Sequence, residues 1–413
     1  NNMTIFGGGA ACCLAIWGFF CGVYFSVAFI NNAPSFSLAK SGHGIISKVP
    51  QHPKEGIVVC DSTNSGAEPE GIGQSNEAES QQQSDKKHPL AALREAQVAG
   101  GAVFGPVTYP ELGQQEEEGV TLDDVLVRVD GPSLAASGGT PRAFDQCHWG
   151  VLELRGEDRL RFLHGQCTNA LETARPGMVL DATVVTATGR TVDLVRAAVL
   201  PDRVLLLCSP NRKRRLAATF DKFLFPADRV AVSEVTNLAV FTLAGQGDSV
   251  ERVLRSMRLE KVPAPGTFCP WTQSDGRKAL VLGGAGLGPA LPGVTVLCPA
   301  PAAPRLWAAL GWWAALAGED AWQEARVLAG RPFPGRELTP DWNALEAGLF
   351  HTVHFNKGCY IGQETLAKVN AAGKLRAELW GVAFPAGADV REGDALGTAD
   401  GKARAGVLTS LLP

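Results

Sequence analysis

The residues with the clearest capacity for chemistry lie near the C-terminal end, in the stretch HTVHFNKGCYIGQETLAKVN. Its thiol, Cys359, follows Lys357 by two positions. We expect HTVHF to be a strand, GQETLAKVN to begin a helix, and residues 356–361 to form the turn between them. The thiol would then lie near the positive end of a helix dipole and near an ammonium group, and both favour the thiolate. Cys359 is therefore the predicted reactive cysteine.

Small and polar residues around this thiol indicate a ligand site. Gly358 and Gly362 give up packing atoms and backbone order, which suggests that the chain is bent or closely approached there. Gln363 and Glu364 would occupy the first helical turn, where an amide and a carboxylate can face a ligand with a mixed hydrogen-bonding edge. Tyr360 adds a ring for stacking. On the residues alone an alternative stays open, a glycine-rich turn with ordinary capping and a buried small residue.

Two other chemistries of this stretch have less support. His351 and His354 would lie on opposite faces of a strand, so together with Cys359 they match no zinc pattern, and we predict no metal site. A cysteine nucleophile of the protease or acyltransferase type would need a base, for which either histidine could serve. It would also need an Asn or Asp partner, which the sequence does not single out.

Two further motifs are expected to be structural. The loop GGAGLG, residues 283–288, is followed by Pro289 rather than by a helix, so a dinucleotide phosphate would find no helix N-terminus there. The basic run RKRR, residues 212–215, begins a helix. One solvated basic turn is a commoner meaning of such a run than a site for phosphate, polyglutamate or RNA.

Length and composition describe a folded body without a strong charge. At 413 residues and 45% hydrophobic content the chain has room for two or three domains. A formal net charge of -4 gives no overall electrostatic reason to expect nucleic acid as a partner. The ten cysteines are scattered without a CxxC pair, which indicates neither a zinc ribbon nor a disulfide scaffold.

The N-terminal part differs from the body. Residues 5–30 carry no charge, and the first charged residue of the chain is Lys40. Such a stretch is long enough for a transmembrane helix or the core of a signal peptide, so we interpret it as a targeting or anchoring segment, with translated non-coding sequence as the alternative. The polar residues that follow cannot bury enough apolar area to become ordered. Residues 1–88 are therefore predicted to be a leader or anchor and a disordered linker.

From residue 89 the pattern is typical of a globular protein. PLAALREAQVAGGAVFG has helical spacing, and GVLELRGEDRLRFLHGQCTNA indicates a strand, a tight turn at Gly156 and a helix. MVLDATVVTATGRTVDLVRAAVLPDRVLLLCSP contains three β-runs joined by short turns, and such neighbours must be antiparallel. We predict an α+β fold with mostly antiparallel sheet over residues 89–375, and the start of a small β-barrel at 376–413.

Several motifs resemble those of one family. KGCYIGQE resembles the KGCYxGQE signature of the YgfZ family of folate-binding, iron-sulfur-cluster-related proteins, in the superfamily of the glycine-cleavage T-protein, an aminomethyltransferase. RFLHGQCTNA resembles its FLxGQxTND segment, TVVTATGRTVDLVRA its following hairpin, and GVLTS its GxxTS strand. AWQEARVLAGRPFPGRELTPDWNALEAGLF looks like the plastid-targeted plant and algal branch. The resemblance covers roughly residues 144–410.

The resemblance implies a T-protein-like ring of domains with a central tetrahydrofolate site and a role in assembling or repairing iron-sulfur clusters. By position, the functional cysteine is Cys359. Asp193 lies in the hairpin where relatives often carry an acidic residue, and it joins the implied cofactor-binding set. The rest of that set is Lys357, Gly358, Tyr360, Gly362, Gln363, Glu364, Gln166, Thr168 and Asn169.

The resemblance also implies partners and a location. The expected partners are folate and iron-sulfur cluster assembly proteins or client enzymes, with no nucleic acid, and with membrane contact only if the apolar N-terminal segment is retained. The expected location is the chloroplast, with the mitochondrion or membrane anchoring through residues 5–30 as alternatives.

The chain departs from the family pattern at two points. Ala170 stands where an Asp usually closes FLxGQxTND, which puts one polar contact of that loop in doubt. Relatives also continue for a further strand or two beyond Leu412, so we expect the barrel to be incomplete.

Two rival functions remain. One is an aminomethyltransferase of glycine cleavage, against which the motif cysteine argues because T-proteins lack it. The other is a non-catalytic module that senses folate. Whether the protein is a folate-dependent transferase stays open.

Overall fold

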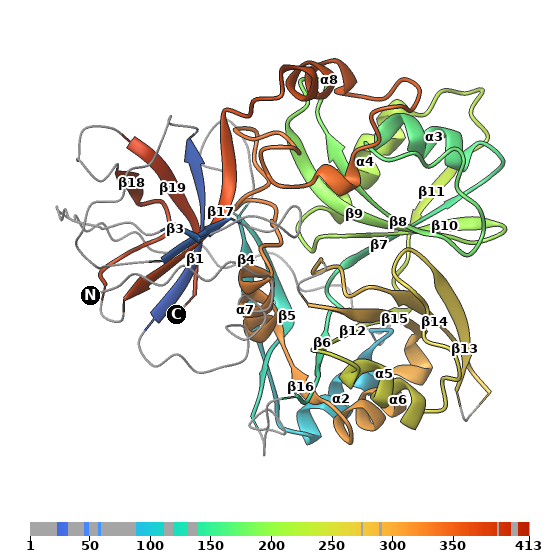
Figure 1. The fold of residues 1–413 in the computed structure, drawn as a ribbon. Helices are drawn as coiled ribbons and strands as arrows, with labels where there is room; N and C mark the ends of the chain where they lie inside the picture. Colours follow the sequence, from blue (N-terminus) through green and yellow to red (C-terminus); the bar gives the residue numbers. More distant parts are fainter. Residues whose placement is uncertain are drawn as a thin grey trace, which may run out of the picture.

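The computed structural model describes residues 23–31, 45–48, 57–58, 88–110, 119–130, 139–273, 276–288, 291–385, 388–397 and 404–412. Within them the strands form three larger sheets and a two-stranded ribbon, with α7 near the centre and the other labelled helices at the upper and lower ends (Figure 1). The named strands of these residues pair antiparallel, apart from the parallel pair of β16 and β6. This confirms the predicted α+β fold with mostly antiparallel sheet.

The first sheet has the strand order β11-β7-β10-β9-β8. Its strands are β7 (Gly150–Arg155), β8 (Val179–Val185), β9 (Thr191–Val199), β10 (Arg203–Cys208) and β11 (Ala231–Glu234). One face is covered by α3 (Arg159–Gln166) and α4 (Lys213–Phe223), whose Phe162 and Phe220 rings meet edge to face at 5.9 Å. The strand, turn and helix predicted around Gly156 and the three predicted β-runs are confirmed here.

The second sheet has the order β13-β14-β15-β12-β6-β16. Its strands are β6 (Arg142–Asp145), β12 (Leu238–Ala244), β13 (Phe268–Thr272), β14 (Lys278–Gly283), β15 (Gly293–Pro299) and β16 (Ala315–Ala317). A hydrophobic cluster packs it against α2 (Ala91–Ala99), α5 (Ser249–Ser256) and α6 (Ala303–Gly311). A second cluster, with Val151 and Leu207 from the first sheet and Val240 and Leu297 from the second, joins the two sheets face to face.

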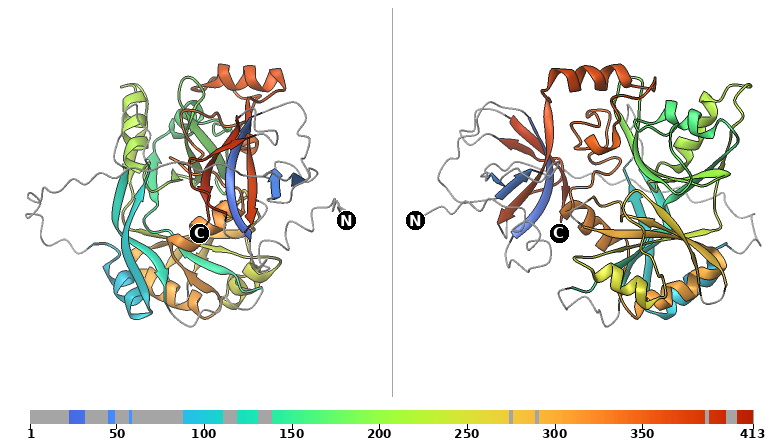
Figure 2. Two further views of the ribbon diagram at one scale, coloured as in Figure 1. Left: turned by 90° about the vertical axis from the view of Figure 1, so that its left-hand side faces the viewer. Right: turned by 45° about the vertical axis from the view of Figure 1, so that its right-hand side comes forward.

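The third sheet combines strands from both ends of the chain in the order β18-β19-β1-β17-β2-β3 (Figure 2). Its strands are β1 (Val23–Asn31), β2 (Ile45–Lys48), β3 (Ile57–Val58), β17 (Ala377–Pro385), β18 (Ala395–Gly397) and β19 (Arg404–Leu411). β1 pairs with both β17 and β19. Part of the apolar stretch predicted as a leader is thus strand, and β2 and β3 are paired strands within the predicted disordered linker. Residues 5–22 of that stretch lie outside the described residues.

The remaining elements connect these sheets. They are the ribbon of β4 (Ala102–Tyr109) and β5 (Val120–Val129), the 3-10 helices η2 (Ala300–Ala302) and η3 (Phe350–Thr352), and the helices α7 (Glu319–Leu328) and α8 (Gln363–Ala372). α8 lies at the opposite end of the molecule from α2, α5 and α6 (Figures 1 and 2). Among the described residues, no helix is both long and apolar enough to cross a membrane.

One local prediction was wrong. HTVHF is not a strand, because the Thr352 hydroxyl donates to the carbonyl of Leu349 at 2.8 Å and closes a 3-10 turn. The helix predicted in PLAALREAQVAGGAVFG is confirmed as α2, which ends at Ala99 because Gly101 turns the chain with a φ of 87° into β4.

Candidate functional site

Two segments that the sequence analysis singled out separately lie against each other. They are the turn that carries KGCYIGQE and the loop that follows α3. The backbone N–H of His354 donates to the carbonyl of Thr168, and that of Ile361 to the carbonyl of Gly165, both at 3.0 Å. The Thr168 hydroxyl donates to the carbonyl of Thr352 at 2.6 Å. The two segments therefore form one unit, called here the motif unit.

Lys357 holds the motif unit together from inside. Its ammonium donates to the carbonyl oxygens of His164, Cys167 and Asn169 at 2.5, 2.7 and 2.8 Å. The Tyr360 ring centroid lies 4.5 Å from Nζ. Burial lowers the pKa of Lys357 to about 8, a shift that the Cys167 thiol opposes. Because an ammonium has three donors, all of them are used within the protein, and Lys357 braces the loop.

Gly362 is required by the backbone of this turn. Its φ is 81°, in the left-handed region, and it stands immediately before α8. A Cβ on Gly362 would lie 2.6 Å from the carbonyl oxygen of Thr186 and 3.0 Å from the α-carbon of Gly189. The turn of the β8–β9 hairpin therefore packs directly on the motif turn, and glycine at 362 makes that contact sterically feasible.

The motif presents its thiol at the surface. Among the six cysteines of the described residues, Cys359 alone is exposed. Gln363 and Glu364 occupy the first turn of α8, as predicted, and the exposed Glu364 carboxylate lies 3.9 Å from the Lys368 ammonium. Tyr360 instead packs in the hydrophobic cluster around Leu366. Within the described residues, no three His, Cys, Asp or Glu side chains are grouped so as to hold a metal ion.

The other predicted residues shape the surroundings of the motif unit. Asn169 donates from Nδ2 to the carbonyl of Asp181 at 2.7 Å, and its Oδ1 accepts the N–H of Ala170 at 2.8 Å. The backbone at Ala170 is thus satisfied without the Asp that relatives carry. Gln166 ends α3 and is half-buried.

Asp193, on β9, has partners of its own. Its carboxylate accepts the hydroxyl of Ser209 at 2.7 Å and the N–H of Ser209 at 3.0 Å. Burial raises the pKa of Asp193, while the Ser209 hydrogen bonds and the charges of Arg212 and Arg331 oppose that shift. Arg212, predicted to lie in a solvated basic turn, is buried instead.

A cavity between the first two sheets brings together residues that the sequence analysis missed. None of residues 357–364 lines it. The rings of Trp149 and Trp322 meet edge to face at 5.5 Å, and their buried indole N–H groups have no hydrogen-bond partner among the described residues. The guanidinium of Arg331 lies 5.2 Å from the Trp149 ring. The lining consists of Gln146, Trp149, Leu194, Arg196, Leu207, Ala285, Gly286, Thr295, Trp322 and Arg331.

Two arginines fix the wall of this cavity formed by the GGAGLG loop. Arg196 donates to the carbonyls of Gly283 and Gly284 at 2.9 and 2.7 Å, and Arg331 donates to that of Gly286 at 2.7 Å. The loop is structural, as its sequence context predicted. Burial lowers the pKa of Arg331 to about 10, so its guanidinium stays charged at neutral pH.

A buried carboxylate, Glu319, lies near the cavity wall together with His148 and Tyr109. Nε2 of His148 is 3.2 Å from Oε2 of Glu319, at the start of α7, and the His148 ring stacks on that of Tyr109 with centroids 6.1 Å apart. Burial, reinforced by the charge of Glu319, raises the pKa of Tyr109, which keeps its proton at neutral pH. These residues come from β4, the loop after β6, and α7, so no local motif could have indicated the group.

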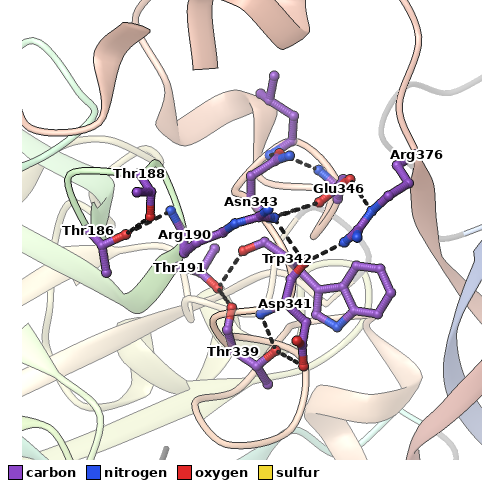
Figure 3. A network of polar contacts seen from close by, with 11 residues as sticks. Thr186, Thr188, Arg190, Thr191, Thr339, Asp341, Trp342, Asn343, Glu346 and Arg376 are labelled. Carbon is purple, nitrogen blue, oxygen red and sulfur yellow. Dashed lines mark hydrogen bonds and ion pairs between the residues drawn. The ribbon is translucent and has the colours of Figure 1, made fainter. Parts of the chain in front are cut away.

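A partly buried polar network ties the β8–β9 hairpin to the segment that leads into the motif unit (Figure 3). Arg190 donates to the carbonyl of Asp341 at 3.0 Å, and Thr191 to that of Thr339 at 3.0 Å. Arg376, before β17, donates to the same Asp341 carbonyl at 2.5 Å and lies 3.5 Å from Glu346. The network fixes the hairpin on which Gly362 packs.

Comparisons with known proteins agree with this architecture. No model of a protein family matches the chain. The chain is 33% identical over 269 residues to a chloroplastic protein of Arabidopsis thaliana whose name places it provisionally among the transferases. That match covers 64% of this chain and 60% of the relative, so the chain spans less than two thirds of that relative's length.

Bacterial relatives match over similar lengths. The aminomethyltransferase of Rubrobacter xylanophilus is 30% identical over 270 residues, which are 65% of this chain and 71% of that protein. The aminomethyltransferase of Desulforamulus reducens is 28% identical over 302 residues, which are 70% of this chain and 76% of that protein. The crystal structure of glycine cleavage system aminomethyltransferase T from Bartonella henselae superposes with a TM-score of 0.58 at 17% identity, over 79% of this chain and 89% of that one. The predicted T-protein-like fold is confirmed.

Proposed function

This chain belongs to the aminomethyltransferase family, and on that premise we propose that it is a tetrahydrofolate-binding accessory protein of iron-sulfur cluster assembly or repair. The observation that carries the proposal is the exposed thiol of Cys359, presented on a turn that Lys357 braces from inside. An exposed cysteine is available for nucleophilic chemistry, whereas buried cysteines are inert. The resemblance of KGCYIGQE to the YgfZ signature supports the link to iron-sulfur clusters.

The lining of the cavity between the first two sheets offers side chains that suit the heterocycle of a folate. Its two unpaired indole N–H donors, on Trp149 and Trp322, suit a flat heterocycle with acceptor atoms, and their rings offer apolar walls. Arg331 would supply a positive charge for a carboxylate or a carbonyl oxygen. A bound tetrahydrofolate supplies a one-carbon carrier. The aminomethyltransferase names of the bacterial relatives support this ligand class.

A plastid location is part of the proposal. Its support is the chloroplastic designation of the Arabidopsis thaliana relative together with the plant and algal character of the segment around Trp322. Proteins that mature iron-sulfur clusters in that compartment, and the enzymes that receive the clusters, are the proposed partners.

The role of the thiol is tested by replacing Cys359→Ser in cells that lack the native protein. We expect iron-sulfur enzyme activities to fall to the level of the deletion, because serine keeps the size of the side chain but loses the thiolate nucleophile. The matched control is Cys269→Ser, which changes a half-buried cysteine on β13 and should preserve activity. Full activity of the Cys359→Ser cells would refute the proposal.

Folate binding is tested by titrating tetrahydrofolate into the purified protein and its Trp149→Phe variant. We expect the dissociation constant to rise about tenfold, because the phenyl ring keeps the apolar contact but removes the N–H donor. The apo variant should be no less stable than wild type, since the change removes a buried unpaired donor. Trp307→Phe, in the cluster under α6, is the control and should bind folate like wild type. Equal affinity of all three proteins would place folate elsewhere.

The relatives named aminomethyltransferase favour a second candidate function, aminomethyl transfer in glycine cleavage. It would be supported by release of methylene-tetrahydrofolate from an aminomethylated lipoyl carrier protein. If the protein is a non-catalytic folate sensor, the Cys359→Ala variant should bind folate and support iron-sulfur enzymes as well as wild type does. Measuring both properties on that variant separates the three functions.

A further inference from the structure

The two glycines of the motif turn differ in what requires them. Gly362 has a left-handed φ and a crowded α-carbon, as described above. Gly358 is not among the residues with positive φ, and the nearest atom to an added Cβ would be Nε2 of His164 at 3.7 Å, an ordinary contact distance. Neither backbone conformation nor crowding therefore explains the glycine at 358. Glycine at 358 leaves the Nε2 edge of the His164 imidazole without a side chain against it from this exposed position.

The imidazole presents a hydrogen-bond donor at that edge. His164 is 7% exposed, and its Nδ1 accepts the backbone N–H of Glu172 at 3.2 Å. Burial, and then the charge of Lys357, lower the pKa of His164, so the ring is neutral near pH 7. With Nδ1 acting as an acceptor, the ring proton lies on Nε2. Nε2 is buried and has no hydrogen-bond partner among the described residues.

The unpaired Nε2–H donor favours a bound acceptor atom. A buried N–H donor without a partner is costly, so a bound acceptor atom would stabilise it. The Lys357 ammonium adds a positive charge nearby, Glu172 a negative one, and the neighbouring His354 influences the ring weakly. The next residue after Gly358 is Cys359, whose exposed side chain makes no hydrogen bond to Nε2.

We propose, resting on the proposed role of the thiol, that Cys359 carries a sulfane sulfur as a persulfide and that the Nε2–H of His164 binds its anionic terminal sulfur beside Gly358. An anionic sulfur suits the unpartnered N–H donor of the imidazole. A neutral one-carbon group on the thiol would gain less from an N–H donor.

The loading step balances without an external oxidant. The Cys359 thiolate attacks the outer sulfur of a persulfide donor, R–S–SH, and forms a new S–S bond. The S–S bond of the donor breaks, R–S⁻ leaves with the electron pair, and the Cys359 persulfide then releases its proton to solvent. The sulfane sulfur moves from donor to protein, and the number of S–S bonds is unchanged.

The experiment uses the purified full chain and glutathione persulfide as the probe. The gain of one sulfur atom on the peptide that contains Cys359 is followed by mass spectrometry, and its half-life is measured against dithiothreitol. His164→Phe removes the donor, and Gly358→Ala places a methyl group at the Nε2 edge of the ring without backbone strain. We expect the half-life to fall roughly tenfold or more in both, the size expected when a hydrogen bond to a charged group is lost. His164→Gln, which keeps an N–H, should retain a longer half-life than His164→Phe.

Folding is checked by thermal melting of each variant. Gly358→Ala should melt like wild type, whereas Gly362→Ala should melt lower because of its φ and its contact with Thr186. If His164→Phe does not fold, Gly358→Ala decides the question.

Two results would overturn the inference: no gain of sulfur on Cys359, or wild-type persulfide half-lives in both folded variants. Neither would touch the proposed function, which fails instead if Cys359→Ser cells keep their iron-sulfur enzyme activities.

Discussion

At the scale of single residues, Lys357 is the side chain on which the motif unit depends. Its buried ammonium donates to three carbonyl oxygens, those of His164, Cys167 and Asn169, at the end of α3 and in the loop that follows it. A charged donor is suited to this because one group can serve three acceptors. The same burial lowers the pKa of Lys357 from 10.5 to about 8.

Replacing Lys357→Met should lower the free energy of unfolding at pH 7 by at least about 2 kcal/mol, because the buried carbonyls lose their donor. Urea denaturation measures this, and Lys368→Met, whose side chain is 80% exposed, is the matched control and should change it little. A Lys357→Met protein as stable as the control would show that water replaces the ammonium.

The stability difference should also depend on pH. Between about 8 and 10.5 the unfolded lysine is protonated and the folded one is not, so unfolding takes up a proton and stability rises with pH. Wild type has this contribution and Lys357→Met does not, so the advantage of wild type should grow from pH 8 to 10. A constant difference over that window would mean that the folded pKa is not lowered.

At the scale of elements, the contact between the loop after α3 and η3 decides where the motif turn lies. The buried Thr168 hydroxyl donates to the carbonyl of Thr352 and accepts the N–H of Thr183 on β8, at 2.6 and 3.0 Å. One side chain thus joins a sheet strand, a loop and a 3-10 helix.

Replacing Thr168→Val should cost about 2 kcal/mol of stability, because the isosteric side chain leaves a buried N–H and a buried carbonyl without this partner. The substitution should also speed hydrogen exchange at the N–H of Thr183. Alkylation of Cys359 by iodoacetamide should speed up less, because the thiol is already exposed. Thr108→Val, on an exposed part of the β4–β5 ribbon, is the control. Unchanged exchange at Thr183 would contradict this role.

The elements also show what a sequence can predict. The first sheet and α3 were predictable because their apolar residues follow strand and helix periods and their turns carry Gly156 and Gly189 at positive φ. The 3-10 turn in HTVHF was not predictable, because a side-chain hydrogen bond of Thr352 overrides the alternating pattern that is typical of a strand. In the cavity, Trp149 and Trp322 are brought together by two packed sheets and a helix, and of the two only Trp322 lies in one of the motifs quoted for the family resemblance. Long-range packing of this kind leaves no local spacing to detect.

At the scale of the whole molecule, a buried ion pair joins the third sheet to the rest. Arg326 of α7 lies 3.1 Å from Glu337, and the hydroxyl of Ser410 on β19 accepts from Arg326 at 2.9 Å and donates to Glu337 at 2.6 Å. The Ser of the GVLTS motif therefore has a docking role, since it satisfies both members of a pair that is fully enclosed.

Replacing Ser410→Ala should destabilise this junction by about 1–3 kcal/mol, the cost of buried partners left incomplete. Limited proteolysis should then release fragments near β19 sooner than in wild type, while the affinity for folate in the proposed cavity between the first two sheets stays the same. Ser233→Ala, on the exposed strand β11, should be cut like wild type. Faster cleavage in the control as well would argue against a specific junction.

The brace formed by Lys357 has a consequence for biosynthesis. The lysine is 193 positions from the His164 carbonyl that it binds. Synthesis must therefore continue 193 residues beyond His164 before its carbonyl receives this donor, and contacts of such separation form late. The exposed thiol of Cys359 gains its fixed setting only after these two distant segments have met.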